Sequence, residues 1–371
     1  MARVKHTKGL RRKRRARRAG QLATICMFGH FAPTYVRNRQ VEESLTSLGA
    51  SVVQVQRDGP VLRRWPRLAR DSRDLDFDAL WVAFLGYSDV PLAWVLSRRR
   101  RVPLVFDAFV LLHDTFVTDR GTVRKRSPAS LFLRTLETVA CHLADVVVID
   151  TVDHAERLAR RVHLDPARIR VLHVGSDHDE VCGDRPSTAP FTVAFYGSFM
   201  PLHGVDTIVR AAALLDDERD IRFVLVGDGQ TKPAAVELAR TLGCENIRFL
   251  DPLHGPALRD VVCDAQVLLG VFGTSAKAMV VVPNKVVDAL ALEKPVVTAG
   301  TPAIRRILDA SQIAMVPPGD PRALADAILA LYSDPAAAVR LASAGRRAYE
   351  DHFSRAARRL EMAAILQAAR P

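Results

Sequence analysis

The alternation of short, β-rich apolar runs with helical patterns is the feature that most constrains the fold of this chain. From residue 21 onward the runs recur with amphipathic segments between them, which is typical of βαβ units and a parallel sheet. The pattern lapses between residues 174 and 190, where two glycines and two prolines interrupt a polar stretch, and then begins again. We therefore predict an α/β protein with two doubly wound, Rossmann-like sheets.

The length of the chain also fits two domains, because its 371 residues exceed the roughly 250–300 at which a single core stops growing. We predict a basic tail over 1–19, an N-terminal domain over 20–174, a linker over 175–190, and a C-terminal domain over 191–371 that includes the last helices. Ligands of parallel sheets bind beyond the carboxyl ends of the strands. Two such domains facing each other across a cleft should therefore hold the chemistry between them.

The predicted strands and helices follow the two blocks of the pattern. Strands of the first block are expected at Leu22–Phe28, Ser51–Gln56, Ala79–Leu85, Val102–Asp107, Asp145–Asp150 and Ile169–His173, with helices at Tyr35–Leu48, Ser130–Leu143 and Thr151–Val162. Strands of the second block are expected at Thr192–Tyr196, Ile221–Val226, Ile247–Leu250, Val267–Val271, Pro295–Thr298 and Ile313–Val316. Its helices are expected at Val205–Asp216, Pro233–Leu242, Pro256–Cys263, Asn284–Ala291, Pro302–Leu308, Arg322–Tyr332, Ala336–Phe353 and Ser354–Ala369.

The positive charge of the chain is concentrated at its start. The formal net charge is +12, but residues 1–18 hold ten Lys and Arg and no acid, which leaves +2 for the rest. A run of like charge without apolar periodicity is expected to be unfolded. The tail is either a solvated extension or a segment attracted to anionic lipid headgroups. Nucleic acid is not expected, because no aromatic residue interleaves the cations.

Cysteine spacing and hydropathy indicate the cellular compartment in which the protein is expected. The five cysteines are scattered without metal-ligand or redox spacing, so neither a zinc site nor a disulfide framework is expected. The longest apolar stretch, Ala79–Leu96, is broken by Gly86, Asp89 and Pro91, whereas a spanning helix needs about 20 apolar residues. We expect a cytoplasmic protein without a metal, and the tail offers peripheral contact with the inner face of the membrane.

The segment 270–298 carries the clearest sign of a ligand site. A strand is followed by a loop with Gly273 and two hydroxyls, and Pro283 suits the first turn of a helix. The residue before this proline has no side chain that can cap a helix. The amides of Asn284 and Lys285 are then without a local acceptor, and an anion is a natural partner for them.

Two charged residues on this helix sharpen the hypothesis. Lys285 in the first turn opposes the helix macrodipole, and a bound phosphate would reverse the sign of that interaction. Asp288 shares a helix face with Lys285, where a carboxylate can accept hydrogen bonds from ribose hydroxyls. The alternative is that the two residues form a surface ion pair on a routine helix.

Together with two other segments, these residues resemble the family-4 retaining glycosyltransferases. The resemblance rests on Pro-Asn-Lys-Val-Val-Asp-Ala-Leu-Ala at 283–291 with Lys-Pro-Val at 294–296, on Phe-Tyr-Gly-Ser-Phe-Met-Pro-Leu-His-Gly-Val-Asp at 195–206, and on Gly-His-Phe-Ala-Pro-Thr-Tyr-Val-Arg-Asn-Arg at 29–39. It implies the two-domain GT-B fold, with Asp288 on the ribose of a nucleotide-sugar donor and the preceding loop around the diphosphate.

The chain departs from the resembled family at three positions. Val280 stands where the family commonly has a glutamate on the donor sugar, and the acid at 288 is Asp rather than Glu. Ser198 and His203 stand where an arginine and a lysine often neutralise the leaving diphosphate. The predicted donor site comprises Gly197, Ser198, His203, Gly227, Gly273, Thr274, Lys277, Asn284, Lys285 and Asp288.

Other cations must then stabilise the leaving diphosphate, because such electrostatic stabilisation is usually a large catalytic contribution. Lys277, Lys285, Arg37 and Arg39 are the candidates. Arg37, Asn38 and Arg39 follow a strand-to-helix loop and are predicted to lie at the mouth of the cleft on the acceptor side. The alternative for both arginines is a solvated position on the helix.

Candidate catalytic residues follow the strand that ends at residue 107. Asp107, His113 and Asp114 lie in the region where the resembled family often places a His or Asp near the reacting sugar. Each carboxylate is alternatively a turn or helix cap. No protein nucleophile is evident, so we expect front-face displacement in which the leaving phosphate assists deprotonation of the acceptor.

The resemblance thus implies a retaining hexosyltransferase of cell-envelope or polysaccharide biosynthesis. Its co-substrate would be a nucleotide diphosphate sugar, with no tightly bound cofactor, and its acceptor a glycan, a lipid or a small metabolite. Two alternatives stay open. One is a nucleotide-sugar epimerase or glycosyl phosphorylase on the same scaffold, and the other is a catalytically silent GT-B subunit that binds a ligand or a partner.

Overall fold

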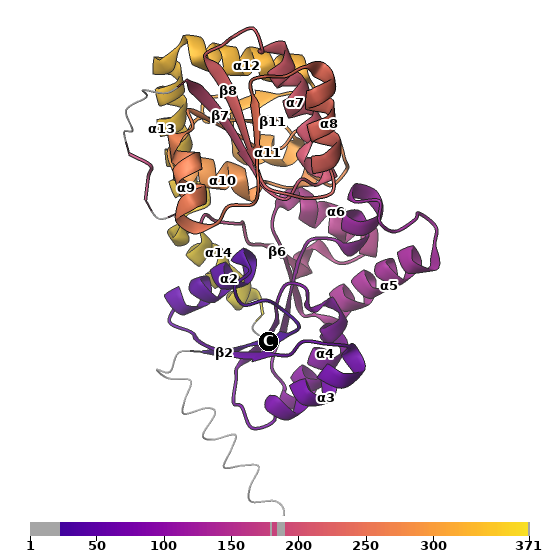
Figure 1. Ribbon diagram of the computed structural model, residues 1–371. Helices are drawn as coiled ribbons and strands as arrows, with labels where there is room; N and C mark the ends of the chain where they lie inside the picture. Colours follow the sequence, from indigo (N-terminus) through magenta and orange to yellow (C-terminus); the bar gives the residue numbers. More distant parts are fainter. Residues whose placement is uncertain (1–22, 179, 184–189, 370–371) are drawn as a thin grey trace, which may run out of the picture.

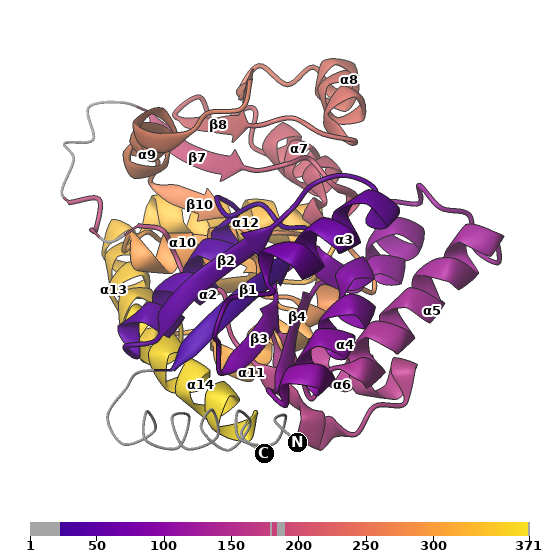
Figure 2. The same ribbon diagram turned by 90° about the horizontal axis from the view of Figure 1, so that it is seen from below.

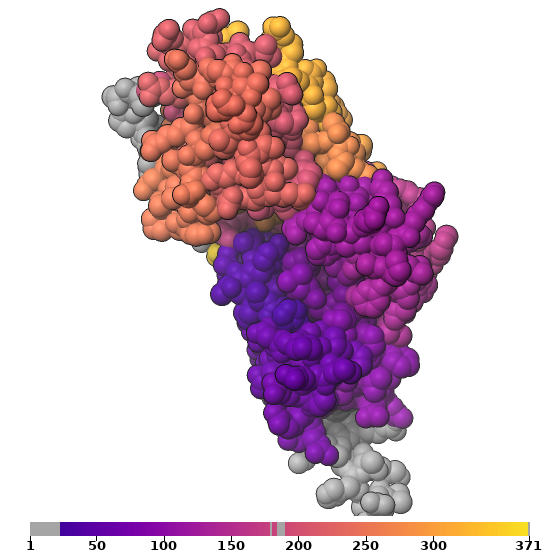
Figure 3. Space-filling model, turned by 45° about the vertical axis from the view of Figure 1, so that its right-hand side comes forward, coloured from indigo at the N-terminus to yellow at the C-terminus, as the bar shows by residue number. Residues whose placement is uncertain are grey.

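Two parallel six-stranded sheets, each flanked by helices, make up the structure (Figure 1). The computed structural model describes residues 23–178, 180–183 and 190–369, so the predicted basic tail and part of the predicted linker, 179 and 184–189, lie outside the described residues. Each of the strands overlaps a predicted range, and the α/β class is confirmed. In the space-filling view the two domains lie one above the other in broad contact (Figure 3).

The N-terminal sheet has the order β2-β1-β3-β4-β5-β6. Its strands are β1 (Thr24–Gly29), β2 (Ser51–Gln56), β3 (Ala79–Val82), β4 (Leu104–Phe109), β5 (Val146–Ile149) and β6 (Ile169–Val171). Its helices are α2 (Val36–Ser47), α3 (Val61–Asp71), α4 (Val90–Arg100), α5 (Pro128–Leu143) and α6 (Val152–Val162). Helices α3 and α4 are not among the predicted ones, because α3 contains a proline and α4 begins inside a long apolar run.

The C-terminal sheet has the order β12-β11-β10-β7-β8-β9, which is the doubly wound Rossmann order. Its strands are β7 (Phe191–Tyr196), β8 (Ile221–Val226), β9 (Ile247–Leu250), β10 (Val267–Leu269), β11 (Val296–Ala299) and β12 (Ala314–Val316). The helices are α7 (Val205–Leu214), α8 (Lys232–Leu242), α9 (Gly255–Asp264), α10 (Asn284–Ala291), α11 (Pro302–Ile307), α12 (Pro321–Ser333), α13 (Pro335–His352) and α14 (Arg355–Ala368).

Local sequence accounts for several of these elements. Strands β3, β4 and β5 are buried along their whole length, as expected of parallel strands covered on both faces. Helices start where a short polar side chain caps them: Ser127 accepts from an amide of α5, Thr151 from one of α6, and Asp334 from one of α13. The predicted break at residues 334–335 is therefore a capped helix start.

Helix α14 leaves the C-terminal domain and packs on the N-terminal one, beside α2 (Figure 2). Its buried residues Met362 and Ile365 and the following Ala369 share a hydrophobic cluster with Ile25 and Trp81 of the N-terminal sheet. The predicted C-terminal domain, 191–371, therefore includes a helix that belongs to the N-terminal core. Spacing along the helix reveals an apolar face but not which domain covers it.

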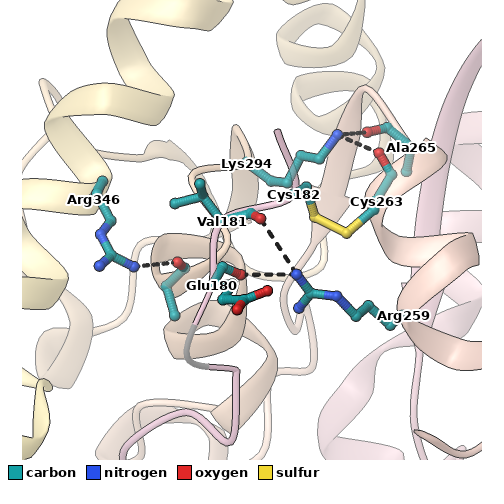
Figure 4. Close-up of a disulfide and its surroundings, with 9 residues drawn as sticks. Glu180, Val181, Cys182, Arg259, Cys263, Ala265, Lys294 and Arg346 are labelled. Atoms are coloured by element: carbon teal, nitrogen blue, oxygen red, sulfur yellow. Dashed lines mark hydrogen bonds between the residues drawn. A yellow bond between two sulfur atoms is a disulfide. The ribbon is translucent and has the colours of Figure 1, made fainter. Parts of the chain in front are cut away.

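The prediction that the cysteines form no disulfide is wrong for one pair. Cys182 and Cys263 are bonded, with Cα atoms 5.2 Å apart and 81 residues between them in sequence (Figure 4). Beside the disulfide, Arg259 donates hydrogen bonds to the carbonyls of Glu180 and Val181. The bond fastens the segment 180–183 to the end of α9, and such a distant pairing leaves no signal in cysteine spacing.

Thiol counting tests this disulfide. The unfolded, unreduced chain should expose the three thiols of Cys26, Cys141 and Cys244, whereas a chain without the bond exposes five. Replacing both Cys182 and Cys263 by Ser should lower the free energy of unfolding by about 2–4 kcal/mol, because the disulfide restricts the unfolded chain. Thiol titration in denaturant and urea melts measure the two effects, and five reactive thiols would refute the bond.

Candidate functional site

The predicted donor residues gather at the carboxyl end of the C-terminal sheet. Strands β7 and β10 are neighbours at the point where the strand order reverses. Gly197 directly follows β7, and the loop 270–283 leads from β10 to α10. Open α/β sheets bind ligands in the crevice at such a switch point, so the topology places these two loops around a candidate site.

Lys285 is buried in this crevice next to His203. Its Nζ atom lies 3.2 Å from His203 Nε2 and 5.1 Å from the centroid of the Phe195 ring. The two residues are only 7% and 5% exposed. A Cβ atom at Gly197 would lie 3.3 Å from both Lys285 Nζ and His203 Cε1. The glycine therefore brings the main chain against both polar side chains with no side chain between them.

The surroundings make the Lys285 side chain a weaker base than an exposed lysine. Burial lowers the pKa of Lys285 to about 8, against the opposing attraction of Asp288. Burial, with the positive charges of Lys285 and Lys277, lowers the pKa of His203 well below its usual value, so the ring is neutral at pH 7. Among the described residues no carboxylate lies within ion-pair distance of Lys285. An anion in the crevice would therefore meet a cation that has no ion-pair partner there.

Helix α10 begins at the same crevice, and no side chain caps it, as the sequence indicates. Pro283, predicted for the first helical turn, is instead the extended residue just before the helix. Its carbonyl accepts a hydrogen bond from the amide of Val286 at 2.9 Å. Amides at an uncapped helix start, with a lysine ammonium beside them, form a geometry suited to binding an anion.

Asp288, one turn further along α10, is held by two hydroxyl groups. Ser176 Oγ donates to its Oδ1 atom at 2.6 Å, and Tyr196 OH donates to its Oδ2 atom at 2.7 Å. Burial raises the pKa of Asp288, and the two hydrogen bonds lower it. Lys285 points to His203, so the alternative of a surface ion pair between Lys285 and Asp288 is wrong.

Close backbone contacts shape the walls of the crevice. A Cβ atom at Gly227, whose φ is +134°, would lie 1.9 Å from the carbonyl oxygen of Gly197. A Cβ atom at Gly273 would lie 2.5 Å from the carbonyl oxygen of Leu202, to which the Gly273 amide donates a hydrogen bond. These glycines are required where two loops pack main chain against main chain. Two further predicted residues of these loops are exposed, Ser198 and Thr274.

The loop before α10 also reaches the N-terminal domain. Lys277 Nζ donates to Thr115 Oγ1 at 3.1 Å, and Ser275 Oγ donates to Asp119 Oδ1 at 2.9 Å. Burial lowers the pKa of Lys277, which is opposed by the charge of Asp119. Lys277, predicted to face the diphosphate, therefore lies at the contact between the domains.

Val280 contacts the N-terminal domain through its backbone carbonyl. Its carbonyl accepts a hydrogen bond of 2.5 Å from Thr151 Oγ1 of the N-terminal domain. Next to Thr151, the buried Asp150 and His154 are joined by a hydrogen bond of 2.7 Å between Oδ1 and Nδ1. These three N-terminal residues are not among the predicted ones, although their position at the carboxyl end of β5 is the signal that could have indicated them.

Asp107 and Arg37, predicted to face the cleft, form a buried ion pair instead. Arg37 Nε lies 2.9 Å from Asp107 Oδ2, and Arg37 Nη2 lies 3.1 Å from Oδ1. Arg37 Nη1 donates to the carbonyl of Leu172 at 2.6 Å. Neither side chain is more than 1% exposed, so the prediction that Arg37 lies at the mouth of the cleft is wrong. The carboxyl end of β4, which carries Asp107, and the start of α2, which carries Arg37, therefore meet inside the core rather than at its surface.

The two residues that follow Arg37 also have structural partners. Asn38 is buried, donates to the carbonyl of Ala32 at 3.0 Å, and accepts from the amide of Phe84 at 3.1 Å. Arg39 forms a partly exposed ion pair with Asp177, at the start of the predicted linker. Only Arg39 of the three therefore has an accessible side chain.

His113 and Asp114 lie together in a cluster of arginines. Asp114 accepts a hydrogen bond of 2.5 Å from Arg157 Nε and forms an ion pair with Arg161. Burial alone would raise the pKa of Asp114, but these bonds hold it below its usual range. His113 Nε2 lies 3.1 Å from Ser130 Oγ, and burial together with Arg161 lowers the pKa of His113. Asp114 is thus committed to two arginines, whereas a catalytic role of His113 stays a prediction.

Comparison with known proteins identifies the domain that holds the crevice. Residues 190–334 match the model of a family described as glycosyl transferases group 1. The C-terminal domain is thus similar to that family over these residues. The D-inositol 3-phosphate glycosyltransferase of Mycolicibacterium gilvum is 32% identical over 176 residues, which are 43% of this chain and 38% of that protein. The matching region thus spans about two fifths of the length of such relatives.

Comparison with solved structures extends the likeness to both domains of the fold. Sucrose-phosphate synthase from Thermosynechococcus elongatus gives a TM-score of 0.74 at 17% identity, covering 94% of this chain and 98% of that one. Anabaena HepE in complex with UDP and glucose gives a TM-score of 0.69 at 15% identity, covering 94% and 100%. These likenesses confirm the predicted two-domain GT-B architecture.

Neither a membrane-spanning helix nor a metal-binding cluster occurs in the described part of the chain. None of its described helices is both long and apolar enough to cross a bilayer. No three His, Cys, Asp or Glu side chains within the described ranges are placed to hold a metal ion together.

Anion binding at Lys285 should weaken above pH 8. Only the ammonium form attracts a phosphate, and the pKa of Lys285 in the free protein is about 8. The affinity for a nucleoside diphosphate should therefore fall by up to about tenfold for each further pH unit. Calorimetric titrations of the unchanged chain and of Lys285→Met at pH 7, 8 and 9 measure this slope, and equal slopes in both proteins would refute the assignment.

The same variant provides an independent check on stability. Burying the ammonium lowers its pKa from 10.5 to about 8, so below pH 8 the charge disfavours folding. Lys285→Met should raise the free energy of unfolding there, by roughly 3 kcal/mol at most. This gain in stability should disappear between pH 8 and 10.5, because in that range Lys285 has lost its proton in the folded state but keeps it in the unfolded state. Denaturant melts across this range measure it.

The buried pair of Arg37 and Asp107 gives a further prediction. Asp107→Asn leaves the Arg37 guanidinium buried without its ion-pair partner, and should lower the free energy of unfolding by about 3–5 kcal/mol. Asp177→Asn is the matched control, since its pair with Arg39 is 42% and 36% exposed and is worth about 0–1 kcal/mol. Chemical denaturation separates the two. If Asp107→Asn instead abolished sugar transfer and left the free energy of unfolding unchanged, a catalytic role of Asp107 would be supported.

Proposed function

We propose that this protein is a retaining glycosyltransferase that transfers a hexose from a nucleotide diphosphate sugar. The observation that carries the proposal is the buried Lys285 ammonium beside the neutral His203 ring and the uncapped start of α10. A diphosphate fits this combination, because it satisfies the helix amides and gives the ammonium an opposite charge. The group 1 domain match supports the same assignment.

Asp288 supplies the recognition of the ribose in this proposal. A carboxylate has about four acceptor positions, and the hydroxyls of Ser176 and Tyr196 occupy two of them. Two remain for ribose hydroxyls. The Ser176 and Tyr196 bonds fix the orientation of the carboxylate from the linker and from the end of β7, so its free positions are set before a nucleotide arrives.

The predicted front-face mechanism is supported by the state of the nearby carboxylates. Asp107 and Asp114 are buried and paired with arginines, so neither presents an oxygen to a bound sugar as a nucleophile. In the proposed reaction the bond from the anomeric carbon to the diphosphate oxygen breaks. The acceptor oxygen bonds to the same face of that carbon, and its proton passes to the leaving phosphate. Lys285 and the α10 amides stabilise the negative charge that develops.

UDP is the nucleotide to test first, because the structures of HepE that share this fold hold UDP or UDP-glucose. A donor-binding subunit without transferase activity is the second candidate. It is favoured by Val280, whose side chain has no polar atom for the donor sugar and whose carbonyl is bonded to Thr151. The two candidates agree on nucleotide binding and differ on turnover.

A donor panel decides between them. We expect one of the UDP-, GDP- or dTDP-hexoses to be hydrolysed above the uncatalysed rate, with release of a sugar whose anomeric configuration matches the donor by NMR. Lys285→Met should reduce this turnover by about ten- to a hundredfold, as for loss of a charge-assisted hydrogen bond. Lys294→Met is the control, because Lys294 donates to the carbonyls of Cys263 and Ala265 at the opposite, amino-terminal edge of the same sheet.

The possible outcomes are distinct. Tight nucleotide binding with no turnover for any donor and acceptor would favour the binding subunit. An inverted product would refute the retaining mechanism, and absence of binding to all three nucleoside diphosphates would sink both candidates.

A further inference from the structure

Helix α5 presents a surface that the donor site does not use. Its residues Leu131 and Phe132 are 66% and 64% exposed, and Val139 is 40% exposed. The helix lies at the outer edge of the N-terminal domain, on the opposite side from α2 (Figure 1). Leu131 and Val139 are eight residues apart and so share one face of the helix, with Phe132 adjoining it. Adjacent large apolar side chains this exposed indicate an interaction surface.

Unpaired cations surround these apolar side chains. Arg124, Lys125 and Arg126 form the loop that leads into α5, and Arg134 lies one turn after Leu131; all four are exposed. No described residue forms an ion pair or hydrogen bond with any of their side chains. The sole acid between residues 120 and 143 is Glu137, which is fully buried and bonded to the amide of His113. The outer surface here is therefore apolar and positive, without a compensating negative charge.

We infer that this α5 surface, made of Arg124, Lys125, Arg126, Leu131, Phe132 and Arg134, docks on an anionic lipid membrane. Leu131 and Phe132 would enter the boundary between headgroups and acyl chains, and the four cations would lie at the depth of the lipid phosphates. A second copy of the chain is a poorer occupant, because its four cations would face these four. Nucleic acid would leave both apolar side chains without an apolar partner.

The α5 surface lies close to the loop that follows β4, which holds the predicted catalytic residue His113. Ser130, in the first turn of α5, lies 3.1 Å from His113, measured from Oγ to Nε2, and His113 follows the carboxyl end of β4. Docking through α5 would therefore hold the acceptor side of the protein close to the membrane. The inference does not depend on the donor chemistry or on the basic tail, which all variants below retain.

Vesicle binding by the full chain tests the inference. Sedimentation with phosphatidylcholine vesicles, with and without phosphatidylglycerol, should show binding only where the anionic lipid is present. The double variant Leu131→Ser, Phe132→Ser should bind anionic vesicles at least about tenfold more weakly. Leu360→Ser on α14 is the matched control, since Leu360 is 74% exposed but lies outside the surface, and it should bind normally.

A charge variant completes the test. Each cation close to an anionic surface contributes about fivefold to binding, so Arg124→Gln, Lys125→Gln and Arg126→Gln together should weaken it by about a hundredfold. All these positions are exposed, and melting curves should be unchanged. If the apolar or the charge variant binds anionic vesicles as tightly as the unchanged chain, the inference is overturned and any binding belongs to the tail. Equal binding to neutral vesicles, or binding to an acidic protein alone, would overturn it as well.

Discussion

The burial of the Lys285 ammonium is the constraint on which the rest of the donor crevice depends. In the free protein three conditions act against this charge: it is withdrawn from water, it stands at the positive end of α10, and no described carboxylate forms an ion pair with it. A phosphate reverses the second and third conditions at once. Burial is the main cause of the lowered pKa of His203, and the Lys285 ammonium lowers it further because it disfavours a second cation beside it. The proposed diphosphate would thus relieve a charge that the free protein leaves without an ion-pair partner among the described residues.

The fold brings the crevice together through main-chain contacts rather than side chains. Gly197 and Gly227 end neighbouring strands, and their backbones touch so closely that a methyl group at Gly227 would overlap the carbonyl of Gly197. Gly273 packs in the same way against Leu202. Because the loops are fixed by their own backbones, the space above Gly197 is left to Lys285 and His203. This preorganisation places the polar groups where strand order reverses, as the doubly wound topology requires.

Periodicity was sufficient to predict the strands of both sheets, since parallel strands and their covering helices leave a strong local signal. The start of α10 and its lysine were also predictable, because helix capping and the macrodipole depend on neighbouring residues alone. The errors arose where the deciding partner is distant in sequence. Arg37 and Asp107 are 70 residues apart, and nothing local distinguishes a buried pair from two charges in a cleft. The disulfide and the placement of α14 depend on tertiary contacts of the same kind.

The loop between β10 and α10 connects the crevice to the other domain. On one side it leads into the helix start proposed to bind the diphosphate, and on the other it contacts the N-terminal domain through Lys277, Ser275 and the carbonyl of Val280. The Val280 contact uses the backbone at the position where the resembled family has a side-chain acid, so the N-terminal domain here meets the loop itself. A displacement of this loop by a diphosphate would act directly on three hydrogen bonds between the domains. This loop therefore joins the proposed donor crevice directly to the N-terminal domain.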